Sequence, residues 1–238
     1  MAVEAGIKMK IKICGIMRPE DAVVATEAGA DFVGMIFVPE RHRLLNSSTG
    51  REIVQAVRGA SPLAKTPKIV GNFADQSQED VNRIVMECGL DYVQLCGKET
   101  VEFCGQIDAV VIKVVHVDPS ATTAADLDQV AERVQTYAGV GHLVTLDRLV
   151  VGVPGGTGHS FDWSIAARLS EMGLPFILAG GLSPENVAQA IAKVQPWGVD
   201  VSSGVETDGV KDHDKIQDFI KNAKNARQQL SRPGDGKS

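Results

Sequence analysis

Residues 109–115 read Ala-Val-Val-Ile-Lys-Val-Val, a short and almost unbroken apolar run rich in β-branched residues. Such a run is typical of a parallel strand that is covered on both faces, because neither face then has to be polar. Similar strand-like runs recur along the chain at 9–14, 32–37, 68–73, 91–95, 142–147, 175–179 and 198–202. The pattern therefore indicates a parallel α/β protein.

Helix signals separate these runs. Residues 18–27 place Pro19 in a first turn, where proline is tolerated, and Ser77 is a suitable N-cap for residues 77–88. Residues 183–186, Ser-Pro-Glu-Asn, repeat this start signal before a helix expected at 187–194, and a last helix is expected from about residue 212 to 228.

Eight strands alternating with helices predict a closed (βα)8 TIM barrel, a single domain over residues 8–228. Residues 1–7 would be an N-terminal extension and residues 229–238 a disordered tail. An open doubly wound sheet is the alternative. It is weakened because no Gly-x-Gly-x-x-Gly follows the first strand and no P-loop motif occurs.

The composition narrows the class of protein. The chain has 238 residues, of which 44% are hydrophobic and 23% charged, with a net charge of -6. This acidic balance argues against nucleic-acid or anionic-membrane partners. No run approaches the roughly 20 apolar residues that span a bilayer, and no signal peptide is recognisable, so we expect a cytoplasmic protein. Its four cysteines lack zinc-site spacing and are expected to be free thiols.

Two candidate proton-transfer groups stand at the ends of predicted strands. Cys14 ends the first run and Asp147 the sixth, the position where parallel barrels carry out chemistry. A thiol becomes a useful base where positive potential favours the thiolate, and a buried carboxyl whose pKa is raised can act as an acid. The alternatives are a small buried apolar residue for Cys14 and a cap for Asp147.

A candidate phosphate site follows the last two strands. Gly180 and Gly181 end the seventh run, and Ser202, Ser203 and Gly204 end the eighth. Glycines let backbone amides approach an anion, and the loops after strands seven and eight are the usual phosphate site of this fold. Ordinary turn chemistry would explain either loop taken alone.

The motifs resemble those of the phosphoribosylanthranilate isomerase family, in the same order over roughly residues 10–222. The resemblance rests on Lys-Ile-Cys-Gly-Ile at 12–16, Gly-Gly-Thr-Gly at 155–158 with Phe-Asp-Trp at 161–163, Leu-Ala-Gly-Gly-Leu at 178–182 and Asp-Val-Ser-Ser-Gly-Val-Glu at 200–206.

This resemblance implies an aldose–ketose isomerase, an intramolecular oxidoreductase that works without cofactor or metal in tryptophan biosynthesis. Its substrate would be the phosphosugar N-(5-phosphoribosyl)anthranilate, with Asp147 as general acid and Cys14 as general base of an Amadori rearrangement to the 1-deoxyribulose 5-phosphate. Gly156, in the glycine-rich motif, would join the substrate-binding residues.

The resemblance also assigns Arg43 to the anthranilate carboxylate, which a guanidinium suits bidentately. Arg41 and His42 stand where the family usually has Ser-Pro, so Arg41 is an alternative, and Cys96 stands where a histidine is usual. Lys12 and Asp200 are open between site and structural roles, whereas His116 and His159 lie near the active face without an assigned role.

Two rival functions remain from the sequence. One is another phosphosugar isomerase or epimerase on the same barrel. Many of those enzymes use a carboxylate or a metal for proton transfer, so a cysteine at position 14 argues against this function. The other is a non-catalytic protein that binds phosphoribosyl ligands. The sequence leaves open whether the protein is a monomer or a homodimer.

Overall fold

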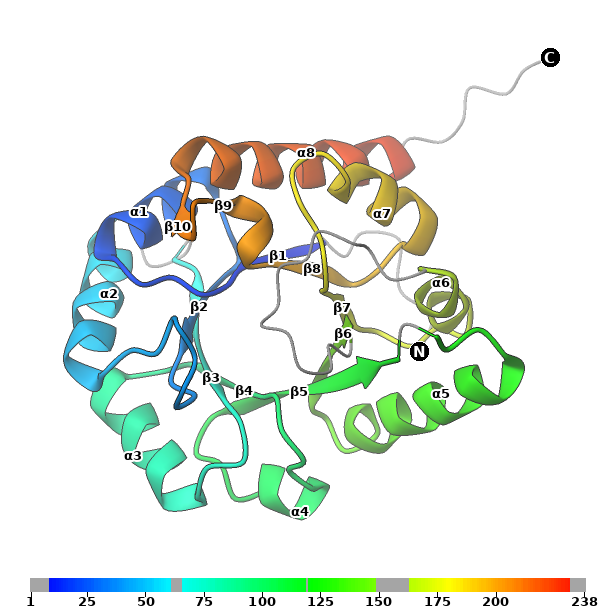
Figure 1. Cartoon of the computed structure of the whole chain (residues 1–238), viewed down its shortest axis with the longest axis horizontal. Helices are drawn as coiled ribbons and strands as arrows, with labels where there is room; N and C mark the ends of the chain where they lie inside the picture. The colour runs from blue at the N-terminus through cyan, green and yellow to red at the C-terminus, as the bar shows by residue number, and fades with distance from the viewer. Residues whose placement is uncertain (1–8, 61–65, 119, 149–162, 232–238) are drawn as a thin grey trace.

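A closed barrel of eight parallel strands forms the centre of the protein (Figure 1), as the sequence predicts. The computed structural model describes residues 9–60, 66–118, 120–148 and 163–231. The strands pair in chain order, and β8 closes on β1. They are β1 (Lys10–Ile13), β2 (Phe32–Ile36), β3 (Lys68–Phe73), β4 (Tyr92–Leu95), β5 (Val110–Val117), β6 (Leu143–Arg148), β7 (Ile177–Leu178) and β8 (Gly198–Val201).

The helices form a ring around these strands in Figure 1. They are α1 (Pro19–Ala28), α2 (Ser47–Ala60), α3 (Gln78–Cys88), α4 (Val101–Cys104), α5 (Ala124–Ala138), α6 (Ser164–Glu171), α7 (Val187–Val194) and α8 (His213–Ser231), with a 3-10 turn at Ser203–Val205. No helix among the described residues combines the length and the apolarity that crossing a bilayer requires.

The helix boundaries agree with the sequence signals at three places and differ at one. Pro19 lies in the first turn of α1, and the Ser77 side chain caps α3 by accepting a hydrogen bond from the Asp80 amide. Residues 183–186 precede α7, which spans Val187–Val194 as expected, and the Ser183 carbonyl accepts from the amides of Asn186 and Val187 in the turn before the helix. The last helix continues past residue 228 to Ser231.

The inward and outward faces of the strands pack in two separate apolar clusters. Phe32, Val70, Ile112 and Ile177 pack on one another from β2, β3, β5 and β7. Side chains from such distant strands can meet only across the barrel interior, so these residues mark the inward face. The alternate, outward residues pack against the helices in a larger apolar cluster. Since side chains alternate along a strand, every second residue counted from these four also faces inward.

Two features after the strands shape the mouth of the barrel. The buried Lys113 ammonium donates to the carbonyls of Leu95 and Gly97 and to the Glu99 carboxylate, at 3.1, 2.7 and 2.9 Å, and thereby fixes the loop after β4. After β8 the chain forms a short antiparallel ribbon, β9 (Glu206–Thr207) with β10 (Val210–Lys211), which the sequence analysis did not predict.

The outward cluster should carry much of the stability. Phe219 on α8 is fully buried in it, so we expect Phe219→Ala to lower the free energy of unfolding by about 3–5 kcal/mol. Met86 on α3 is 79% exposed, and Met86→Ala should change it by less than about 0.5 kcal/mol. Urea denaturation followed by circular dichroism measures both. Equal effects of the two substitutions would contradict this assignment of the core.

Candidate active site

Cys14 and Asp147 both face the interior at the carboxyl end of the strands. Leu143 packs against the inward cluster, and two steps of two residues along β6 lead to Asp147. Cys14 follows β1, and its sulfur accepts a hydrogen bond from the Asn72 amide nitrogen at 2.9 Å. Asn72 is inward because it lies two residues after Val70. The structure thus brings the two predicted proton-transfer residues to one mouth, from strands three places apart in the barrel.

A buried ion pair lies below Cys14. The Lys12 ammonium is fully buried and stands 2.7 Å from a carboxylate oxygen of Asp200, its register partner on β8. Burial alone would lower the pKa of Lys12, but the Asp200 carboxylate and the Cys14 sulfur more than offset this, and its pKa lies above the ordinary value. Lys12 therefore stays charged, and its ammonium lies beside the Cys14 sulfur.

The environment of Asp147 suits a proton donor. Desolvation raises the pKa of its carboxyl, and the negative charge of Asp200 adds to this, while His116 and Lys12 act in the opposite sense. Oδ1 accepts from the Arg148 amide at 2.8 Å. A Cβ built on Gly180 would stand 2.9 Å from this oxygen, and the φ of +87° also favours glycine there. Gly180 therefore gives the carboxyl its space.

The second thiol at the mouth is a poorer base. Cys96 follows β4, and the Gln94 amide nitrogen lies 3.7 Å from its sulfur. Desolvation raises the pKa of Cys96 to about 12, so it remains protonated at neutral pH. Cys14, next to the Lys12 ammonium, is the better candidate. All four cysteines are free thiols, as predicted.

The two predicted phosphate loops lie against each other. A Cβ at Gly204 would collide with the carbonyl of Leu182, so only glycine allows this close approach between the loop after β7 and the turn after β8. Gly181 has a φ of +69°. The Ser202 hydroxyl is buried and has no hydrogen-bond partner among the described residues, although Lys211 donates to the Ser202 carbonyl at 2.8 Å.

Arg43 lies near these loops at the edge of the barrel mouth, called the rim below, and is paired with the carboxylate of Glu206. Its stem lies over Gly15, beside Ser202, and its Nε and Nη2 donate to the two oxygens of Glu206 at 2.9 and 2.6 Å. Lys211 also donates to Glu206, at 2.7 Å. Burial alone would raise the pKa of Glu206, but Arg43 and Lys211 more than offset this and lower it. The cluster of two cations and one carboxylate keeps one net positive charge.

Several polar atoms at the mouth lack partners. Within the described part of the chain, the inward residues leave these buried side-chain atoms without a hydrogen bond: Asn72 Oδ1, Gln94 Oε1, His116 Nδ1, Thr145 Oγ1, Asp200 Oδ1 and Ser202 Oγ. Because buried polar atoms are costly when unpaired, a ring of them indicates a place that receives a polar ligand.

Sequence reasoning missed part of this site. Asn72, Glu206 and Lys211 were not among the predicted residues, while Lys12 and Asp200 were left open. Counting in twos along the strands could have placed Lys12, Asn72 and Asp200 inside the barrel. Gly156 lies outside the described residues.

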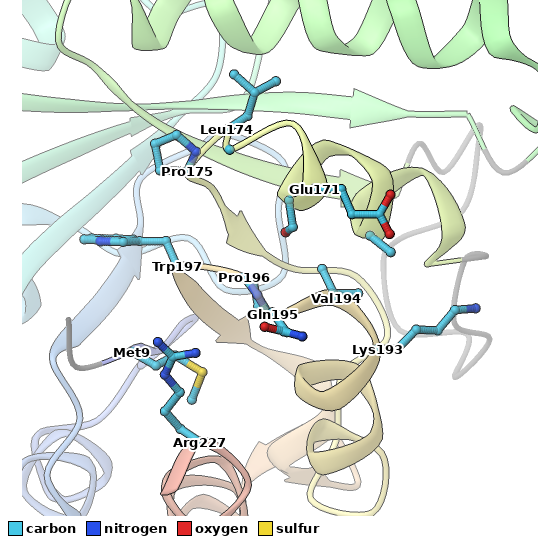
Figure 2. Close-up of a pocket in the computed structure, with 13 residues that line it drawn as sticks. Met9, Glu171, Leu174, Pro175, Lys193, Val194, Gln195, Pro196, Trp197 and Arg227 are labelled. Carbon is cyan, nitrogen blue, oxygen red and sulfur yellow. The ribbon is translucent and has the colours of Figure 1, made fainter. Parts of the chain in front are cut away.

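A second hollow lies at the opposite end of the barrel. This pocket of about 360 Å³ is lined by residues that precede strands, among them Met9, Leu174, Pro175 and Trp197, together with Gln195 after α7 and Arg227 on α8 (Figure 2). Since that end of a (βα)8 barrel usually serves stability and the other end chemistry, we assign the catalytic site to the mouth with Cys14 and Asp147.

A closed parallel barrel with proton-transfer groups at the carboxyl ends of its strands defines the protein, by class, as a (βα)8-barrel enzyme. The family model of N-(5'phosphoribosyl)anthranilate (PRA) isomerase matches residues 11–222. The chain belongs to this family, which confirms the resemblance seen in the sequence.

Individual members of this family are similar to the chain over most of its length. The chain is 40% identical to N-(5'-phosphoribosyl)anthranilate isomerase of Dehalococcoides mccartyi over 92% of its own length and 97% of the relative. It is 42% identical to that of Trichlorobacter lovleyi, over 92% and 99%. The crystal structure of the Thermotoga maritima phosphoribosyl anthranilate isomerase is similar with a TM-score of 0.77 and 35% identity, covering 92% of this chain and all of that one.

The ion pair between Lys12 and Asp200 allows a direct test. We expect Lys12→Met to lower the free energy of unfolding by about 3–5 kcal/mol, because it leaves the Asp200 carboxylate buried without a counter-charge. The double variant Lys12→Met, Asp200→Asn should recover more than half of this loss. Chemical denaturation at neutral pH measures both. A double variant no more stable than Lys12→Met would show that the missing counter-charge is not the cause.

Proposed function

We propose that this protein isomerises N-(5-phosphoribosyl)anthranilate to 1-(2-carboxyphenylamino)-1-deoxyribulose 5-phosphate, the Amadori rearrangement of tryptophan biosynthesis. The observation that carries the proposal is the position of Cys14 and Asp147, which face one mouth from β1 and β6 with unpaired polar atoms around them. Membership of the PRA isomerase family supports the substrate.

The chemistry needs one acid and one base on either side of the sugar. Asp147 protonates the ring oxygen, the C1–O bond breaks, and a Schiff base forms between C1 and the anthranilate nitrogen. Cys14 then removes the proton from C2, and the resulting enolamine tautomerises to the ketone. The iminium nitrogen acidifies this C–H bond, so a modest base such as Cys14 is sufficient. Desolvation raises the pKa of Asp147, which favours the protonated form that the first step needs.

The two anionic ends of the substrate have separate places in this proposal. The phosphate lies at Gly180, Gly181 and the turn Ser202–Gly204, where the two loops meet and the Ser202 hydroxyl is unpaired. The anthranilate carboxylate lies at Arg43. Nε and Nη2 each give one hydrogen to Glu206, which leaves three of the five guanidinium N–H groups for a second anion.

The cellular setting stays a prediction. We expect the protein in the cytoplasm, as a monomer or a homodimer. For comparison, one similar crystal structure contains monomers generated from the dimeric Thermotoga maritima enzyme. Size-exclusion chromatography with light scattering distinguishes the two states.

The acid–base pair predicts the effect of single substitutions. Cys14→Ser and Asp147→Asn should each lower kcat about 100-fold or more, because each removes one proton-transfer step. The readout is the loss of anthranilate-type fluorescence from freshly made phosphoribosylanthranilate. Cys88→Ser is the matched control, because Cys88 lies on α3 with its thiol at the Ser47 carbonyl and should leave kcat unchanged. Full turnover by Cys14→Ser would reject Cys14 as the base.

The environment of Asp147 also predicts a pH dependence. A general acid works only while protonated, so its contribution is present below its folded pKa and lost as the pH rises through it. Because desolvation raises the pKa of Asp147, we expect the contribution of this acid to kcat to persist above the ordinary aspartate value of about 4 and to be lost on the alkaline side of it. A pH–rate profile over the stable range tests this. A decline that begins with an ordinary carboxyl would contradict the role of Asp147.

A further inference from the structure

His116 is an inward residue at the mouth to which the proposed mechanism gives no task. It lies four residues after Ile112 on β5, so it shares the inward face with the apolar cluster. Its register partner on β6 is Asp147, and Figure 1 shows β5 and β6 side by side. The imidazole and the proposed general acid are therefore direct neighbours on adjacent strands.

The contacts of the ring determine what each nitrogen can do. Nε2 lies 3.0 Å from the Cys96 carbonyl oxygen. A carbonyl can only accept a hydrogen bond, so Nε2 carries the proton, and in the neutral ring Nδ1 keeps its lone pair. Nδ1 is buried and has no partner among the described residues. The ring thus keeps an unused acceptor, on a residue that is paired in register with Asp147.

The other unpaired atoms indicate what this acceptor receives. Asn72 Oδ1, Gln94 Oε1 and Asp200 Oδ1 are also acceptors without donors. Asn72 and Gln94 direct their amide nitrogens to the sulfurs of Cys14 and Cys96. The mouth therefore offers more acceptors than donors, which suits a ligand rich in hydroxyl groups. The ribose ring of a phosphoribosyl substrate is such a ligand.

We propose that the Nδ1 atom of His116 accepts a hydrogen bond from a sugar hydroxyl of the substrate and so positions the ring oxygen at Asp147. This inference rests on the proposed function and adds to it the residue that orients the sugar. The hydroxyl replaces the missing donor at Nδ1, while the Nε2 bond to Cys96 holds the ring in place. His116 is a positioning residue, and Asp147 remains the group that transfers the proton.

The two nitrogens can be tested separately. In His116→Gln the longer side chain can place an amide nitrogen where Nε2 stands and keep the bond to the Cys96 carbonyl, but it has no acceptor at Nδ1. In His116→Asn the amide lies near the place of Nδ1, and the bond to Cys96 is lost. His142→Gln is the matched control, because His142 precedes β6 at the opposite end of the barrel.

Thermal unfolding and steady-state fluorescence kinetics read out the two roles. We expect His116→Gln to keep the melting temperature within about 2 °C of the wild type and to lower kcat about 10- to 100-fold, with KM changed less than about threefold, because lost orientation slows the chemical step. His116→Asn should melt earlier but turn over faster than His116→Ala. His142→Gln should match the wild type in kcat and KM.

The results of these experiments can overturn the inference in three ways. Wild-type kcat in His116→Gln would overturn the inference and leave the ring as a tether of the loop after β4. If His116→Gln does not fold, equal kcat values for His116→Asn and His116→Ala would overturn it instead. A wild-type protein that does not turn over phosphoribosylanthranilate would overturn the proposed function and this inference together, whereas turnover that His116→Gln retains overturns the inference alone.

Discussion

The buried ion pair between Lys12 and Asp200 is the constraint on which the rest of the site depends. It joins β1 to β8 at the seam where the barrel closes, and both groups are inside, away from water. Such a pair contributes little net stability, because desolvation offsets the attraction. Its effect is on position and charge: it places a permanent ammonium two residues below Cys14, where an apolar layer would give the thiol no electrostatic support.

The strands use one alternation for two purposes. Outward residues join the apolar cluster with the helices, so the frame of the site is as rigid as a protein core. On β5 and β6 the inward residues change from apolar to polar along the strand, from Ile112 to His116 and from Leu143 to Asp147. The polar end costs free energy when its atoms are unpaired. A ligand that pairs them recovers this cost, so the free protein is prepared to bind rather than optimised for stability alone.

The fold was predictable because its signals are local. Continuous apolar runs mark buried parallel strands, and Pro19 and Ser77 mark helix starts. The ribbon of β9 and β10 was missed because strands of two residues have no periodicity to detect.

The site was predictable only where a residue carries a recognisable chemistry. Cys14 and Asp147 could be found from their place at strand ends. The partner of Arg43 could not, because Glu206 lies 163 positions away in the chain and only folding brings it near. Cys96 stands where the family usually has a histidine, so the sequence suggested that the site lacks an imidazole. The structure places the imidazole of His116, on the next strand, against the carbonyl of Cys96.

Charge is distributed so that binding and proton transfer occur in separate places. The chain as a whole carries -6, which by itself would repel a substrate with a phosphate and a carboxylate. At the rim, Arg43 and Lys211 outnumber Glu206, so the approach to the loops after β7 and β8 keeps one positive charge. Deeper in the barrel, Lys12 and Asp200 cancel. A further cation next to Asp147 would add to the lowering of its pKa by His116 and Lys12 and would weaken it as a proton donor, so the anion-binding charge is better placed at the rim, on the side of β1 and β8.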